Sequence, residues 1–167
     1  METKVLVTYA TTYGSTQEIA EFVAETLRKS GLAVELQPMR QVQSLAGYQA
    51  VVLGAPLYMF HWHKDALRFM KRHEQALKKT PAAVFALGPF NNVEDEWKEV
   101  RSELSKELAR FPWFAPAAVE VFGGKFDPTH LRFPWNLLPA LKKIPASDIR
   151  DWEAIRAWAE NLPLVKS

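Results

Sequence analysis

The chain has 167 residues, of which 48% are hydrophobic and 24% are charged, and this is typical of a single soluble globular domain. It contains no cysteine, which excludes disulfides, cysteine-ligated iron–sulfur clusters and thiol catalysis, so any redox chemistry must come from a bound organic cofactor. The net charge of +2 is mild and the basic residues are interspersed with acidic ones, which excludes a nucleic-acid partner. No apolar run approaches the roughly 18 residues of a membrane span, so we do not expect an integral membrane protein. The length and the absence of cysteine predict one cytoplasmic domain covering residues 1–167.

The stretch from Val5 to Thr16 combines a strand pattern with a polar turn. Its apolar, β-branched start predicts a strand buried on both faces. A helix is expected next, because apolar residues recur at helical spacing at Ile19, Phe22, Val23 and Leu27. Ser15 and Glu18 have the separation of a capping box, so this helix should begin at about Ser15.

The turn between this strand and helix is rich in hydroxyl groups. A helix N-terminus presents unpaired N–H groups and about half a positive charge, and here it coincides with Thr11, Thr12, Gly14, Ser15 and Thr16. This combination predicts a phosphate-binding site. The alternative is a plain strand-to-helix turn whose hydroxyl residues only cap the helix. The glycines of the dinucleotide-binding fingerprint and the lysine of the Walker loop are missing.

Strand and helix patterns alternate along the rest of the chain. Gly31 is expected to end the first helix, and an alternating edge strand follows at 33–36 before Pro38. Further strands are expected at 50–53, ending in Gly54-Ala55-Pro56, at 82–87 and at 117–122. Helical faces are expected at Ala66, Leu67, Met70 and Leu77, at Trp97, Val100, Leu104 and Leu108, and at Trp152, Ile155 and Leu162.

This order of elements predicts a doubly wound α/β fold. Right-handed crossovers require helices on both faces of a five-stranded parallel sheet, for which we expect the strand order 2-1-3-4-5. The order reverses between the first and third strands, so a ligand should lie at their C-terminal ends. The segments that meet at this edge are 11–16, 54–62 and 88–92.

Aromatic residues are unusually frequent in the segments at this edge, where they could stack on a flat ring system. The alternative is that each ring only covers an end of the core. We predict a cofactor-binding set made of Thr11, Thr12, Tyr13, Gly14, Ser15, Thr16, Pro56, Leu57, Tyr58, Met59, Phe60, His61, Trp62, Leu87, Gly88, Pro89, Phe90, Asn91 and Asn92.

No catalytic side chain and no metal site are predicted. His61 and His63 lack a third ligand nearby, whereas catalytic zinc needs three protein ligands. A Ser-His-Asp arrangement and a closely spaced carboxylate pair are also missing from the pocket segments. Any reaction at this edge must therefore be carried by a bound group.

The turn at 11–16 resembles the phosphate loop of the flavodoxin family, in which a strand, a Thr/Ser-x-Thr-Gly-x-Thr pattern and a helix follow one another. Thr11, Thr12 and Gly14-Ser15-Thr16 fit this pattern, while Tyr13 replaces the hydroxyl residue beside the glycine. The resemblance implies that the phosphate belongs to FMN and that the flat ring is its isoalloxazine. It also implies that the protein passes electrons through the flavin.

A narrower resemblance covers nearly the whole chain. The stretches Leu53–Tyr58 with His61-Trp62-His63, Phe122–Asp127 and Asp151–Ile155 are similar to the menaquinone-dependent protoporphyrinogen oxidase branch of this superfamily. This similarity implies a quinone, a redox partner protein or a small-molecule electron donor or acceptor as partner. A soluble electron carrier, a flavin-dependent oxidoreductase and a flavin-free binding or regulatory domain remain alternatives.

The segment 125–147 is predicted to be an insertion relative to the minimal fold. It is rich in aromatic and apolar residues and contains four prolines, Pro128, Pro134, Pro139 and Pro145. Packing on the sheet edge is the expectation. Covering the flavin, or contact with a quinone donor or with the inner face of the membrane, are the alternatives.

Overall fold

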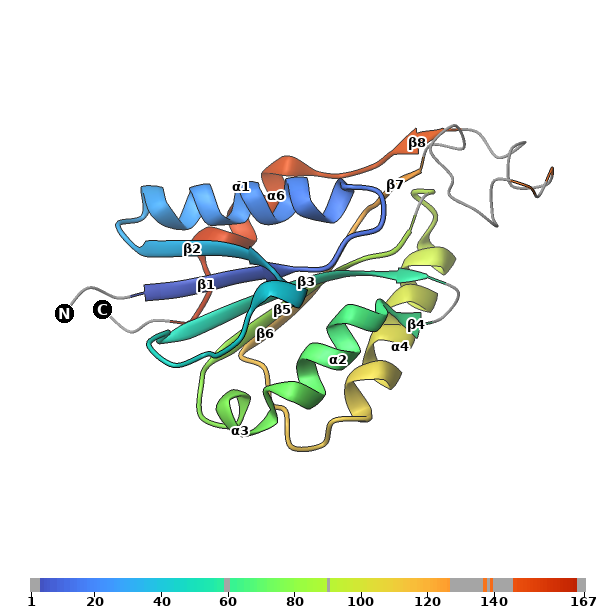
Figure 1. Ribbon diagram of the computed structural model, residues 1–167. Coiled ribbons are helices and arrows are strands. Elements are labelled where there is room, and N and C mark those ends of the chain that lie inside the picture. Colours follow the sequence, from blue (N-terminus) through green and yellow to red (C-terminus); the bar gives the residue numbers. More distant parts are fainter. Residues whose placement is uncertain are drawn as a thin grey trace.

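The computed structural model describes residues 4–58, 61–89, 91–126 and 146–164, together with Leu137 and Pro139. A central sheet is enclosed between two layers of helices (Figure 1). The strands are β1 (Lys4–Tyr9), β2 (Ala33–Pro38), β3 (Ala50–Tyr58), β4 (His61–Trp62), β5 (Ala82–Leu87), β6 (Ala118–Phe122), β7 (Lys125–Phe126) and β8 (Ser147–Asp148). The helices are α1 (Ser15–Lys29), the 3-10 turn η1 (Met39–Gln41), α2 (Lys64–Arg72), α3 (Glu74–Leu77), α4 (Glu94–Ala109) and α6 (Trp152–Glu160).

Five parallel strands form the sheet in the order β2-β1-β3-β5-β6, which confirms the predicted order 2-1-3-4-5. α1 and α6 cover one face, and α2, α3 and α4 cover the other (Figure 1). The doubly wound α/β fold with helices on both faces is therefore confirmed. Among the described residues, no helix is long and apolar enough to cross a bilayer.

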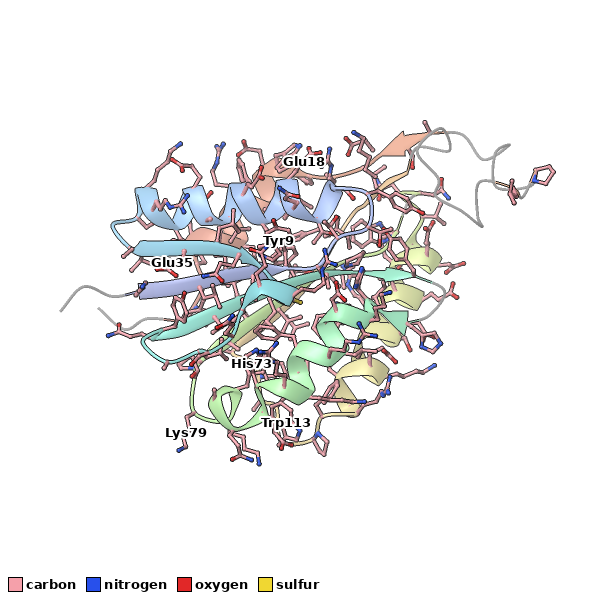
Figure 2. The ribbon with its side chains drawn as sticks, in the orientation of Figure 1. Tyr9, Glu18, Glu35, His73, Lys79 and Trp113 are labelled. Atoms are coloured by element: carbon pink, nitrogen blue, oxygen red, sulfur yellow. The ribbon has the colours of Figure 1, made fainter. Side chains whose placement is uncertain are left out.

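Each face of the sheet has its own hydrophobic core, because successive strand side chains point to opposite sides. Val5, Val7 and Tyr9 of β1 pack with α1 and α6, and Figure 2 shows Tyr9 between α1 and the sheet. Leu6 points to the opposite core, together with residues of α2 and α4. Strands buried on both faces explain the nearly continuous apolar runs in the sequence.

The structure differs from the sequence prediction at the third strand, which does not end at Gly54. β3 continues to Tyr58 because its ladder with β5 extends to the pair Pro56–Leu87. Its last two residues also pair antiparallel with β4. Gly54 is needed within the sheet, since a Cβ at this position would overlap the ring of Phe85 on the neighbouring strand. The segment 54–62 is thus mainly a strand and hairpin rather than a loop.

Two helix predictions are also corrected. The face from Ala66 to Leu77 belongs to two helices, because the backbone leaves the helical conformation at His73, where φ is −108° and ψ is 23°. No capping box forms at α1: the N-cap is Gly14, in the left-handed region with φ of 92°, where L residues other than glycine are strained. Ser15 is consequently the first helical residue, and the Glu18 carboxylate accepts a hydrogen bond from Arg150 instead of capping the helix.

Candidate functional site

Three segments of the chain meet at the C-terminal edge of the sheet, on the right in Figure 1. Tyr9 pairs with Gly54 across the β1–β3 ladder, and the Ala10 N–H donates to the Gly54 carbonyl at 2.9 Å. On the other side of β3, Pro56 pairs with Leu87 of β5. The loop after β1, the end of β3 and the segment after β5 are therefore neighbours, as expected at the reversal of strand order.

The loop after β1 turns sharply into α1. The Gly14 N–H donates to Thr11 Oγ1 at 2.8 Å, which closes the turn and leaves the Thr11 hydroxyl proton free to donate. The first intrahelical bond runs from the Glu18 N–H to the Gly14 carbonyl. The N–H groups of the helical residues before Glu18 therefore have no acceptor within the helix. This is the arrangement that binds anions at helix N-termini.

Two observations fit a phosphate at this turn. Thr16 is 1% exposed, and its Oγ1 has no hydrogen-bond partner among the described residues. A buried hydroxyl without a partner is costly, so it is expected to bind something. At Gly14 an added Cβ would meet no protein atom within 4 Å, so the space above this backbone is open. The residues present therefore fit the phosphate of an FMN.

A wall of the site is formed by Tyr58 at the end of β3. Its ring packs edge-on against Tyr13 of the loop, with centroids 6.2 Å apart, and its side chain hydrogen-bonds that of Thr12. Burial raises the pKa of Tyr58 to about 12, so the phenol is neutral at physiological pH. The sequence expectation that residues of these two segments lie together is thus met for Thr12, Tyr13 and Tyr58.

The segment after β5 is held in place by backbone contacts. The Gly88 N–H donates to the Phe122 carbonyl at 3.3 Å, and the Gly124 N–H donates to the Pro89 carbonyl at 2.8 Å. Gly88 must be a glycine because a Cβ there would overlap the Val100 side chain on α4. Of the exposed pair Asn91 and Asn92, the second accepts a hydrogen bond from Trp97 Nε1 at 3.0 Å.

Several predicted site residues have side chains that pack into the two cores. Trp62 is 1% exposed, and its Nε1 donates to the Ala55 carbonyl at 3.1 Å, so its indole supports β3 from within. Leu57 and Leu87 are likewise buried on opposite faces of the sheet. Pro56 is buried in β3, where its carbonyl accepts the His63 N–H. Met59, Phe60 and Phe90 lie outside the described residues.

The two histidines of the hairpin have different surroundings. His61 is exposed and lies 3.7 Å from the carboxylate of Glu107, measured from Nδ1 to Oε1. His63 Nδ1 accepts the Asp65 N–H and so caps α2, while burial lowers the pKa of His63. Within the described ranges, no cluster of three or more potential metal-ligating His, Asp or Glu side chains occurs.

Sequence reasoning missed two groups beside the site. Glu107 on α4 is buried at 6% exposure and accepts the Trp62 N–H; its place on the apolar face of α4, three residues after Leu104, is a signal that could have indicated it. Arg150 joins Asp148 of β8 to Glu18 of α1, at 2.9 and 3.1 Å. Figure 2 shows Glu18 on the outer side of α1. Nothing in the sequence indicated a pair that is 132 residues apart.

Comparisons of the sequence with known proteins point to one family. The family model described as "Flavodoxin domain" matches residues 6–135. The protoporphyrinogen IX dehydrogenase [quinone] of Escherichia coli K12 is 22% identical over 170 residues, which cover 95% of this chain and 94% of that protein. The protein of the same name from Leishmania major is 24% identical, over 96% of this chain and 76% of its own length.

Solved structures show the same fold. Oxidised flavodoxin 1 from Bacillus cereus superposes with a TM-score of 0.63 at 17% identity, over 99% of this chain and 100% of that one. The rubredoxin:oxygen oxidoreductase of Desulfovibrio gigas reaches a TM-score of 0.59 at 17% identity, over 95% of this chain and 35% of its own. The strand order, the loop before α1 and the match over residues 6–135 agree, and the chain belongs to the flavodoxin domain family.

Proposed function

We propose that this protein binds FMN at the C-terminal edge of its sheet and passes electrons through the flavin to a quinone. The observation that carries the proposal is the buried, unpartnered hydroxyl of Thr16 in the first turn of α1, beside the open space at Gly14. A phosphate at this point would receive the hydroxyl protons of Thr11 and Thr16 together with N–H groups of the helix start.

The remaining side chains of the site would hold the ring rather than perform chemistry. Tyr58, whose ring already rests against Tyr13, offers a flat neutral face on which an isoalloxazine could stack. Pro56 and Gly88 bring backbone groups to the same edge. When bound, FMN supplies the capacity to accept and release two electrons with protons, so no acid or base from the chain is required.

The relatives favour a quinone-linked dehydrogenase over a simple electron carrier. Both curated proteins described above are named as quinone-dependent protoporphyrinogen IX dehydrogenases, and both match over nearly the whole of this chain. In each step of such a reaction the organic donor loses two hydrogens and one quinone gains two, becoming a quinol; oxidation of a porphyrinogen to the porphyrin removes six hydrogens and therefore consumes three quinones. We propose protoporphyrinogen IX as the donor on the basis of this relationship.

Flavin binding is tested by reconstitution. Purified protein mixed with excess FMN and desalted should retain flavin absorbance and quench flavin fluorescence. Tyr58→Ala should weaken FMN binding by about 1 to 3 kcal/mol, through lost stacking and lost burial together. Protein that stays colourless and leaves FMN fluorescence unchanged would refute the proposal and support a flavin-free binding domain.

The reaction is tested with the loaded protein. Protoporphyrinogen IX and a water-soluble menaquinone analogue are mixed with it under anaerobic conditions, and porphyrin fluorescence is followed over time. Turnover that requires both FMN and the quinone is expected. A protein that binds FMN and is reduced by a flavodoxin reductase, yet shows no porphyrinogen oxidation above the FMN-only control, would instead be an electron carrier.

A further inference from the structure

The β3–β4 hairpin carries Tyr58 and is too short to be stable by itself. β4 has two residues, and its ladder with β3 consists of the pairs Leu57–Trp62 and Tyr58–His61. Two-stranded hairpins are at best marginally stable in water unless they pack against another element. The position of Tyr58 therefore depends on what ties β4 to the rest of the molecule.

Trp62 is the point of attachment within the hairpin. Its indole is 1% exposed in the core on the α2 and α4 side of the sheet, and its Nε1 donates to the Ala55 carbonyl. The following residue, His63, donates its N–H to the Pro56 carbonyl at 3.0 Å. These contacts tie the hairpin back to β3, but they leave the backbone N–H of Trp62 to be satisfied from elsewhere.

Glu107 of α4 supplies that acceptor. Its Oε2 receives the Trp62 N–H at 3.2 Å and lies 3.5 Å from Arg110 Nη1, while its Oε1 lies 3.7 Å from His61 Nδ1. The Glu107 side chain is only 7% exposed, although an ionised carboxylate is costly to bury without partners. A hydrophobic residue on this face of α4 could be buried without the desolvation cost of a carboxylate. The hydrogen bond to the Trp62 N–H therefore explains why a carboxylate is present.

We propose that Glu107 is a positioning residue that holds the β3–β4 hairpin on α4 and thereby sets the place of Tyr58 against the flavin ring. The effect on the flavin rests on the proposed FMN site, whereas the attachment of the hairpin to α4 does not. The path runs from α4 through the Trp62 N–H to the β4–β3 pairing and on to Tyr58, which contacts Tyr13 and Thr12 of the phosphate loop. The contact between the rings of Tyr58 and Tyr13 thus joins the hairpin to the loop before α1.

The test compares Glu107→Ala with Glu107→Gln. The glutamine keeps an acceptor oxygen of the same reach and removes the charge, whereas the alanine removes both. Ile155→Ala is the matched control, because Ile155 is fully buried on α6 at the opposite face of the sheet. It lowers global stability without touching the hairpin. Amide hydrogen exchange in the FMN-free protein and FMN affinity in the reconstituted protein are both measured.

Glu107→Ala should speed exchange of the Trp62 amide and its hairpin neighbours at least tenfold beyond the change in Ile155→Ala. It should weaken FMN binding several-fold and shift the visible spectrum and midpoint potential of the bound flavin. Glu107→Gln should restore most of the exchange protection and affinity.

Hairpin exchange in Glu107→Ala that equals the exchange in Ile155→Ala would overturn the inference, as would loss of protection in Glu107→Gln equal to that in Glu107→Ala. If the wild-type protein fails to bind FMN, the proposed function is wrong. The exchange comparison still decides whether Glu107 holds the hairpin.

Discussion

At the scale of single residues, the candidate site contains a buried hydroxyl group that has no hydrogen-bond partner in the part of the protein that the structure describes. Thr8 and Thr16 both have buried hydroxyls without a partner among the described residues. Thr8 lies within β1, whereas Thr16 lies in the first turn of α1, beside the N–H groups that precede the helical ladder. Comparing the two threonines therefore separates two effects of a buried hydroxyl: its effect on the stability of the fold and its effect on FMN binding.

Thr16→Val should leave the FMN-free protein as stable as the wild type or slightly more stable, because it removes an unsatisfied buried hydroxyl. The same change should weaken FMN binding by about 1.5 to 3 kcal/mol, the range for a hydrogen bond to a charged group. Thr8→Val should share the first effect and lack the second. Urea unfolding and FMN titration of both variants make the comparison, and equal FMN affinity in the two would place the phosphate elsewhere.

Gly14→Val should impair FMN binding for two separable reasons. Its φ of 92° strains any residue with a Cβ by about 1 to 2 kcal/mol, and the added side chain would occupy the open space proposed for the phosphate. Gly31→Val provides the control, because Gly31 has a φ of 93°, is equally unobstructed and lies at the far end of α1. The two variants should lose similar stability in thermal unfolding, and only Gly14→Val should lose flavin. Retention of FMN by both would contradict the site.

At the scale of elements, titratable residues lie at two junctions of the fold: Arg150 beside the β7–β8 pair, and His73 between α2 and α3. Arg150 holds the pKa of Asp148 below its usual range through their hydrogen bonds, and it bonds Glu18 of α1 as well. The two strands β7 and β8, which bound the segment 125–148, are thereby tied to the start of α1, beside the loop proposed to bind phosphate (Figure 1). Most of the predicted insertion, including Trp135 and Leu138, lies outside the described residues.

His73 connects α2 and α3, packs on the Phe69 ring with centroids 4.4 Å apart, and is 6% exposed. Burial, with a smaller effect from the charge of Arg72, lowers its pKa from 6.5. The unfolded chain therefore binds this proton more readily than the folded protein does. The contribution of neutral His73 to the free energy of unfolding should be complete above about pH 6.5. It should be lost as the pH falls from there through the lowered pKa of the folded protein.

Urea unfolding at pH 7.5 and pH 5.5 measures this effect, and His73→Gln should flatten the difference between the two values. The comparison uses pH slopes rather than absolute stabilities, because the substitution also disturbs packing on Phe69. A variant whose stability falls with pH as steeply as that of the wild type would show that His73 is not the group responsible. His63, whose pKa burial also lowers, would then be the next to replace.

At the scale of the whole molecule, the net charge bears on the potential of the proposed flavin. Its net charge is +2, and the acids beside the hairpin have basic partners. Asp65 lies 3.5 and 3.9 Å from Arg40 and Arg68. Glu107, which accepts the Trp62 N–H, lies 3.5 Å from Arg110. Reduced FMN adds negative charge beside a phosphate, and surrounding carboxylates oppose that addition. A mildly basic surface opposes it less.

Bound FMN should therefore have a higher midpoint potential here than in an acidic flavodoxin measured alongside. About 1.4 kcal/mol corresponds to about 59 mV for a one-electron step, so a few screened charges should raise the potential by tens of millivolts. Redox titration at low and high salt provides the measurement, and the difference between the two proteins should shrink as salt increases. An equal or lower potential here would refute the electrostatic argument, and a difference that ignores salt would assign it to other causes.

The sequence by itself determined the order of the strands and helices, because period-2 and period-3.6 patterns are local and right-handed crossovers leave few topologies. The loop after β1 was predictable for the same reason: its hydroxyl residues, Gly14 and the helix start are contiguous.

Only the tertiary structure decided the extension of β3 to Tyr58 and the burial of Trp62. It also revealed the contacts of Glu107 with β4 and of Arg150 with α1. These features join residues far apart in the chain, and their cause is packing of one element on another. A helix such as α4 can show in its pattern that position 107 is buried, but its partner is decided by where β4 lies.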